Sequence, residues 1–125
     1  MRRCSRLLVA SQRMADLVSI KIMKSGGIVR AREIASIAEA AGITAYGGTM
    51  FEGGLAIAAG LHMVAATPNI ALGAEFYTST WVMGVDILKS PIMIDNGMTR
   101  VPTGPGLGVD VDEDIVKRCS TTHFE

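Results

Sequence analysis

Two charged residues stand near the C-terminal ends of short apolar segments. Lys21 lies in residues 17–23 (LVSIKIM), and Glu75 lies in residues 70–76 (IALGAEF). If both segments are β-strands, their side chains alternate between two faces. The aliphatic residues of each segment then share one face, which leaves Lys21 and Glu75 on the opposite face. An ammonium and a carboxylate at matching strand ends are groups that could take part in proton transfer.

Neither charge is decisive by itself, because a single lysine or glutamate on a strand is more commonly a solvated or edge charge. Glu52 follows the second predicted strand and could face the same rim, although a carboxylate just before a helix is usually a cap. Lys24 is better interpreted as a turn or surface charge. His62 lies within an apolar helix and is better interpreted as a packed or helix-surface histidine.

Three aspartates near the C-terminus imitate the start of a calcium-binding loop. They are Asp110, Asp112 and Asp114. Ile115 stands where such a loop requires glycine, so a helix-capping turn explains them better. No serine–histidine–acid or cysteine–histidine arrangement is recognisable in the sequence.

Alternating helices and strands are predicted to position these residues. Apolar periodicity predicts three helices, over residues 2–14, 31–41 and 55–66. Short β-branched segments predict three strands, over residues 17–23, 43–46 and 70–76. Gly42 is the expected C-cap of the second helix, and residues 67–69 (TPN) end the third. Further along the chain we predict a weak helix over residues 80–85, a hairpin of residues 92–94 with 98–101, and a helix over residues 112–119.

This alternation predicts an α/β fold with parallel strands and right-handed crossovers. Three units in 125 residues cannot close an eight-stranded barrel, which needs about 250 residues. A doubly wound sheet is the alternative, but no GxGxxG or Walker A motif follows a predicted strand. In a barrel, Lys21 and Glu75 would point inward at the C-terminal rim, where chemistry occurs.

Composition argues against several classes of protein. Hydrophobic residues make up 49% of the chain and the formal net charge is zero, which argues against disorder and against nucleic-acid binding. No apolar stretch reaches the roughly 18 residues of a membrane span. Cys4 and Cys119 lie at opposite ends without metal-ligand spacing, which predicts free thiols in a cytoplasmic protein.

Four blocks in the same order resemble the muconate cycloisomerase subgroup of the enolase superfamily. Residues 18–27 (VSIKIMKSGG) resemble its sixth barrel strand, and residues 38–54 (AEAAGITAYGGTMFEGG) resemble the helix, strand and loop that follow. Residues 72–79 (LGAEFYTS) resemble its eighth strand, and residues 101–114 (VPTGPGLGVDVDED) resemble its C-terminal signature. The resemblance implies the C-terminal part of a (β/α)₈ barrel.

The same resemblance implies how the chain is divided and what its charged residues do. Residues 1–90 would form the partial barrel, and residues 91–125 a C-terminal extension that returns toward a capping domain. Lys21 matches the family's catalytic lysine, an acid/base or electrostatic partner beside the substrate. Glu75 matches the acid of the eighth strand beside the substrate carboxylate, and Glu52 matches a recurrent glutamate that is a candidate substrate-binding residue. The implied reaction is proton transfer next to a carboxylate, as in the interconversion of cis,cis-muconate and muconolactone.

The resemblance also implies parts that the sequence does not contain. The family binds Mn²⁺ or Mg²⁺ through carboxylates on its third to fifth strands and has another lysine on its second strand, all of which would precede Met1. The chain alone is therefore expected to be incomplete and inactive. Its expected partners are a small carboxylate substrate and the N-terminal portion of the same enzyme or a complementing chain, with a homo-oligomer once complete. No nucleic-acid or membrane partner is expected.

Two alternatives stay open within this resemblance. The enzymes o-succinylbenzoate synthase, N-acylamino acid racemase and dipeptide epimerase share the block around Lys21. Dipeptide epimerases typically carry an aspartate pair just after the eighth strand, whereas residues 76–81 read FYTSTW, which favours a cycloisomerase. The other alternative is a non-catalytic remnant that acts only through assembly.

Overall fold

The computed structural model describes residues 3–120 of the chain, and the side chains of residues 7–120. Its elements are α1 (Arg3–Ser11), β1 (Leu17–Ile20), α2 (Ile22–Ser25), α3 (Ile28–Ala40), β2 (Thr44–Gly48), α4 (Gly54–Ala65), β3 (Ala74–Glu75), α5 (Ser79–Met83) and α6 (Glu113–Cys119). The start of the first predicted helix at residue 2 and the thiol of Cys4 lie outside this description.

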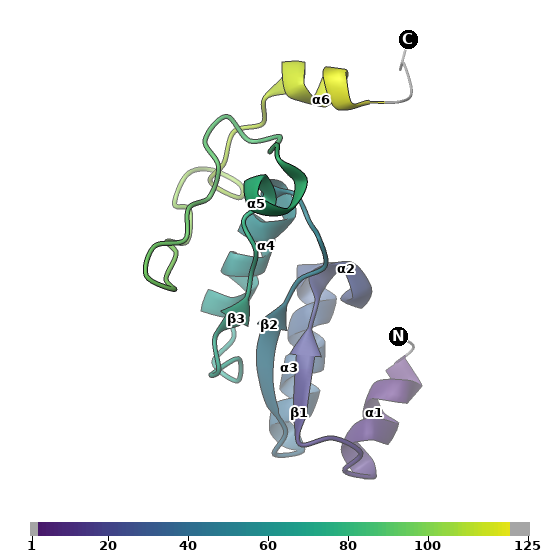
Figure 1. Cartoon of the computed structure of the whole chain (residues 1–125). Helices are drawn as coiled ribbons and strands as arrows, with labels where there is room; N and C mark the ends of the chain where they lie inside the picture. The colour runs from purple at the N-terminus through teal and green to yellow at the C-terminus, as the bar shows by residue number, and fades with distance from the viewer. Residues whose placement is uncertain (1–2, 121–125) are drawn as a thin grey trace.

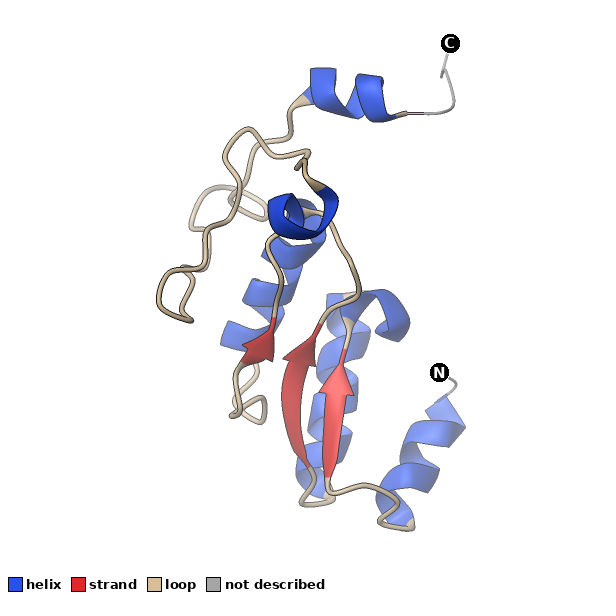
Figure 2. Cartoon of the chain, viewed as in Figure 1, coloured by secondary structure: helices blue, strands red, loops and turns tan. Residues whose placement is uncertain are grey.

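The strands form one parallel sheet in the order β1-β2-β3. Their C-terminal ends point to the same edge of the sheet, toward α2 and α5 (Figure 1). Helices α3 and α4 contact each other and both contact β2, so they cover the same face, behind the strands in Figure 2. The predicted α/β class and parallel arrangement are therefore confirmed. The three strands do not form a closed barrel.

Small side chains let α3 lie close against the sheet. Ala31 and Ala35, one helical turn apart, have no exposed surface. They pack with Ile20 of β1 and Met63 of α4, each only 1% exposed. Burial of a side chain of that size contributes roughly 1.5–3 kcal/mol. Ala31 and Ala35 thus belong to the surface that holds helix and sheet together.

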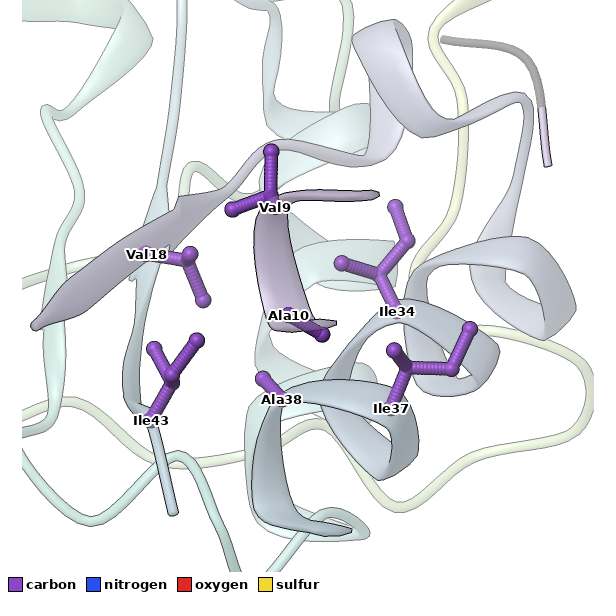
Figure 3. Close-up of a pocket in the computed structure, with 7 residues that line it drawn as sticks. All are labelled: Val9, Ala10, Val18, Ile34, Ile37, Ala38 and Ile43. Carbon is purple, nitrogen blue, oxygen red and sulfur yellow. The ribbon is translucent and has the colours of Figure 1, made fainter. Parts of the chain in front are cut away.

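An apolar hollow lies where α1 meets β1 and α3 (Figure 3). The side chains that line it are Val9, Ala10, Val18, Ile34, Ile37, Ala38 and Ile43. No polar side chain lines the hollow, so it offers nothing to bind a charged substrate.

The first strand is shorter than predicted, because the chain turns directly after it. Residues 22–25 form the single turn α2, and the Ser25 hydroxyl donates to the Lys21 carbonyl at 2.8 Å. Gly26 and Gly27 follow with φ angles of 89° and 107°, which glycine adopts readily. The prediction that Met23 belongs to the strand was wrong, and its side chain is 65% exposed.

The third strand is also shorter than predicted. Only Ala74–Glu75 is extended, because the chain turns just before it and Gly73 has a φ of 75°. The predicted apolar row along residues 70–76 therefore does not form. Ile70 joins the core at 6% exposed, whereas Leu72 is 63% exposed.

The predicted hairpin is reduced to a tight turn. Asp95 and Met98 exchange two backbone hydrogen bonds of 2.8 Å. Asn96 and Gly97 between them have φ angles of 48° and 75°, as in a type I′ turn. No strand continues on either side, so the predicted strands over residues 92–94 and 98–101 were wrong.

The last helix is capped as predicted. Asp112 precedes α6, and its Oδ1 accepts hydrogen bonds from the backbone N–H groups of Asp114 and Ile115, both at 3.0 Å. Cys119 at the end of α6 is an exposed free thiol. Within residues 3–120, none of the helices has the length and apolar character needed to cross a membrane.

A buried carboxylate joins the loop after β3 to α4, and the sequence analysis did not select it. Asp86 is 5% exposed. Its Oδ1 accepts hydrogen bonds from the N–H groups of Gly54 at 3.1 Å and Leu88 at 3.2 Å, and its Oδ2 accepts one from the Ser79 hydroxyl. Because Gly54 begins α4, Asp86 satisfies a donor that has no partner within the helix and lies at the positive end of the helix dipole.

Asp86→Ala is expected to lower the free energy of unfolding by roughly 2–3 kcal/mol, because it leaves buried donors without an acceptor. Asp86→Asn keeps a carbonyl oxygen at the Oδ1 position. Its free energy of unfolding should therefore fall by less than half of the decrease in Asp86→Ala. Urea denaturation monitored by circular dichroism measures both values. Equal losses in the two variants, or no loss in either, would contradict this role for the Asp86 oxygens.

Candidate functional site

Lys21, Gly48 and Glu75 form a row across the C-terminal ends of the three strands. Lys21 directly follows β1 and keeps an extended backbone, with φ −111° and ψ 122°. The register pairs Ile20 with Gly47, and it pairs Gly48 with Glu75. Lys21 therefore lies next to Gly48 at the same edge of the sheet. The predicted placement of both charges at the C-terminal ends of their strands agrees with this geometry, whereas their roles stay a prediction.

The Lys21 ammonium bridges the other two strands. Its Nζ lies 3.2 Å from Oε1 of Glu75 and donates a second hydrogen bond to the backbone carbonyl of Thr49. The Thr49 hydroxyl in turn donates to the backbone carbonyl of Glu75 at 3.0 Å. Thr49 thus contacts both the lysine and the strand that carries the glutamate. The Lys21 and Glu75 side chains are 22% and 41% exposed, so solvent reaches both.

This pair has the chemical groups for proton transfer. A lysine ammonium can donate a proton or stabilise negative charge that develops on a substrate, and a neutral amine or a carboxylate can accept a proton. The ion pair of Lys21 with Glu75 also holds the ammonium in one position when no other anion is present.

The other residues considered in the sequence have separate positions. Glu52 lies in the loop between β2 and α4 but is not the acceptor at the helix start, which is Asp86. The expectation that Glu52 caps this helix was therefore wrong, and its role in substrate binding stays a prediction. His62 contacts the C-terminal segment, where its Nε2 lies 3.1 Å from the carbonyl oxygen of Leu107.

An exposed aromatic group lies just beyond the strand ends. The ring centroids of Phe51 and Tyr77 are 6.2 Å apart, and those of Tyr77 and Trp81 are 6.1 Å apart with nearly parallel planes. Phe51 and Trp81 are 73% and 77% exposed. The sequence analysis missed this group, although two of its members closely follow predicted strands. Exposed apolar patches of this kind commonly mark contact surfaces.

The described residues do not fit a resident metal ion. Among them, no group of three or more histidine, cysteine, aspartate or glutamate side chains could hold one.

Comparison with protein families covers nearly the whole chain. The sequence profile of the family described as "Enolase C-terminal domain-like" matches residues 5–115. The chain belongs to this family. The resemblance stated from the sequence blocks is therefore confirmed. The relatives of this chain include isomerases.

Several relatives that are similar in sequence are cycloisomerases. Muconate cycloisomerase 1 from Rhodococcus opacus is 39% identical over 111 residues, which cover 89% of this chain and 30% of that protein. Chloromuconate cycloisomerase from Delftia acidovorans is 38% identical over 109 residues, which cover 87% of this chain and 29% of that protein. The chain thus spans about three-tenths of the length of these relatives.

Solved structures agree with the sequence relatives. A muconate cycloisomerase from Azorhizobium caulinodans matches 90% of this chain and 31% of its own, with 42% identity and a TM-score of 0.78. The N-succinyl Arg/Lys racemase from Bacillus cereus matches 95% of this chain and 31% of its own, with 30% identity and a TM-score of 0.86. The fold is therefore shared by family members with different reactions.

Glu75→Gln is expected to lower the free energy of unfolding by less than about 1 kcal/mol, because solvent screens this partly exposed ion pair. The matched control is Glu33→Gln, which removes the partly exposed Arg30–Glu33 pair on α3. Thermal and urea unfolding compare the two. A loss above about 2 kcal/mol for Glu75→Gln alone would show that the pair is a main support of the fold.

Proposed function

We propose that this chain supplies the lysine and glutamate side of an active site that transfers a proton next to a carboxylate, as in muconate cycloisomerases. The observation that carries the proposal is the Lys21–Glu75 pair, which joins the C-terminal ends of the two outer strands of the parallel sheet. Its support from relatives is the 39% identity to a muconate cycloisomerase over 89% of the chain.

The proposed reaction closes cis,cis-muconate to muconolactone. One carboxylate oxygen adds to the distant double bond, and the electron pair of that bond moves to the carbon next to the other carboxylate. That carbon takes a proton, which the Lys21 ammonium donates, and the neutral amine takes a proton back in the reverse direction. Glu75 keeps the ammonium at the strand ends before substrate arrives. We assign Glu52 to substrate binding.

We further infer that residues outside this sequence complete the site. The N-terminal portion of the same protein, or a separate complementing chain, would supply the carboxylates for Mn²⁺ or Mg²⁺ and the second lysine. When bound, the cation supplies stabilisation of negative charge on the substrate. Support comes from the free edge of β1, where Leu17 is 42% exposed, because an unpaired strand edge is a template for further pairing.

Racemisation of an N-acylated amino acid is the second candidate function. The observation that favours it is the fold similarity to the N-succinyl Arg/Lys racemase, with a TM-score of 0.86 over 95% of the chain. Proton transfer next to a carboxylate is common to both reactions, so the Lys21–Glu75 pair by itself does not distinguish them.

The test is muconate turnover in the presence of Mn²⁺, with this chain alone and mixed with the N-terminal portion of a muconate cycloisomerase. Turnover is expected only in the mixture. Lys21→Ala should lower kcat/KM by about 10²–10⁴-fold, the range of a lost acid or base. The matched control is Lys24→Ala, which removes an exposed lysine three residues away and should change kcat/KM less than about twofold.

Each other outcome has a definite meaning. Turnover by the chain alone would overturn the need for a complementing polypeptide. Racemisation of N-succinylarginine without muconate turnover would favour the second candidate. A folded mixture that acts on neither substrate, or one in which Lys21→Ala is as active as Lys24→Ala, would contradict the proposed function.

A further inference from the structure

The Lys21 side chain reaches Glu75 by crossing over the central strand at Gly48. A Cβ atom placed on Gly48 would lie 3.0 Å from Cγ and 3.1 Å from Cε of Lys21, and it would overlap the Ser19 hydroxyl. The Ser19 hydroxyl and the lysine stem therefore both border the space that a side chain at position 48 would enter. Gly48 has no positive φ angle, so its backbone alone does not require glycine.

A Cβ atom placed on the neighbouring Gly47 would contact different atoms, because residues 47 and 48 face opposite sides of the sheet. A Cβ on Gly47 would lie 2.6 Å from Cγ2 of Val64 and 3.1 Å from Cβ of Ala74, on the side of α4. Successive residues of a strand face opposite sides. Gly47 thus permits close helix packing, whereas Gly48 opens the face that carries Lys21.

Strand spacing explains why this path matters. Neighbouring strands lie about 4.8 Å apart, so the backbones of β1 and β3 are separated by roughly 10 Å. A lysine stem that had to rise over a side chain at position 48 would point away from the sheet. Because the contacts of 3.0 and 3.1 Å with Cγ and Cε require the stem to shift, the hydrogen bonds of its ammonium to the Thr49 carbonyl and to Glu75 would be disturbed together.

We propose that Gly48 is a positioning residue for Lys21, and that its missing side chain provides the passage along which the lysine crosses β2 to reach Thr49 and Glu75. The catalytic importance of this passage rests on the proposed function. The passage itself is a property of the described residues and can be tested without a substrate.

The first experiment measures the rate at which an amine-acylating reagent modifies each lysine of the chain, by peptide mass spectrometry. In Gly48→Ala the displaced Lys21 amine is expected to react several-fold faster and to approach the rate of Lys24. Gly53→Ala is the matched control, since its Cβ would meet only Cε of Met83 at 3.9 Å, and it should leave Lys21 unchanged. An unchanged Lys21 rate in folded Gly48→Ala overturns the proposal.

A second experiment covers the case in which Gly48→Ala does not fold. The substitution is repeated in a chain that carries Ser19→Ala and Lys21→Ala, where the atoms that it would meet are gone. If those contacts are the reason for glycine, Gly48→Ala should change the urea midpoint far less in this background than in the natural sequence. Equal loss of stability in both backgrounds overturns the proposal, because glycine would then be needed for another reason.

Failure of the proposed function is distinguishable from failure of this inference. Suppose that Lys21 is labelled faster in Gly48→Ala but that the wild-type mixture does not turn over muconate. This result would contradict the proposed function and support the role of Gly48 in positioning Lys21. In an active mixture, Gly48→Ala is expected to lower kcat more than it changes KM. Normal kcat with unchanged Lys21 labelling would overturn the inference and leave the function in place.

Discussion

The two adjacent glycines at the end of the central strand are the constraint on which the site depends. Gly47 leaves room for Val64 of α4, and Gly48 leaves room for the stem of Lys21 on the other face. A side chain at either position would push apart elements that now touch. One dipeptide therefore sets both how closely the helix packs and how the ammonium reaches the glutamate.

The helix layer holds the loop after β3 in a defined position. Gly60 of α4 approaches the ring of Phe76, where a Cβ would lie 2.8 Å from Cζ. Asp86, which follows α5 further along this segment, is joined to the first residue of α4 through the Gly54 N–H group. Glu75 immediately precedes Phe76, so these contacts outside the site also position the carboxylate that holds Lys21.

Sequence patterns located the long helices well and the strand ends poorly. The apolar residues of α3 and α4 recur over many positions, so single departures do not hide the pattern. A strand of a few residues gives a much weaker pattern, and a single turn can replace half of the strand. Gly73, with its positive φ, converts part of the predicted third strand into a turn, and Leu72 becomes exposed as a result.

By itself, the sequence determined the α/β class, the shared face of Lys21 and Glu75, and the membership of the enolase C-terminal domain-like family. These follow from local alternation and from residue blocks that need no coordinates. Only the tertiary structure decided that Thr49 accepts from Lys21, that a Cβ on Gly48 would meet the Lys21 stem, and that Asp86 anchors α4. The physical reason is that these contacts join residues far apart in the chain. Strand order and register bring such residues together, and both are set by packing of the whole sheet against its helices.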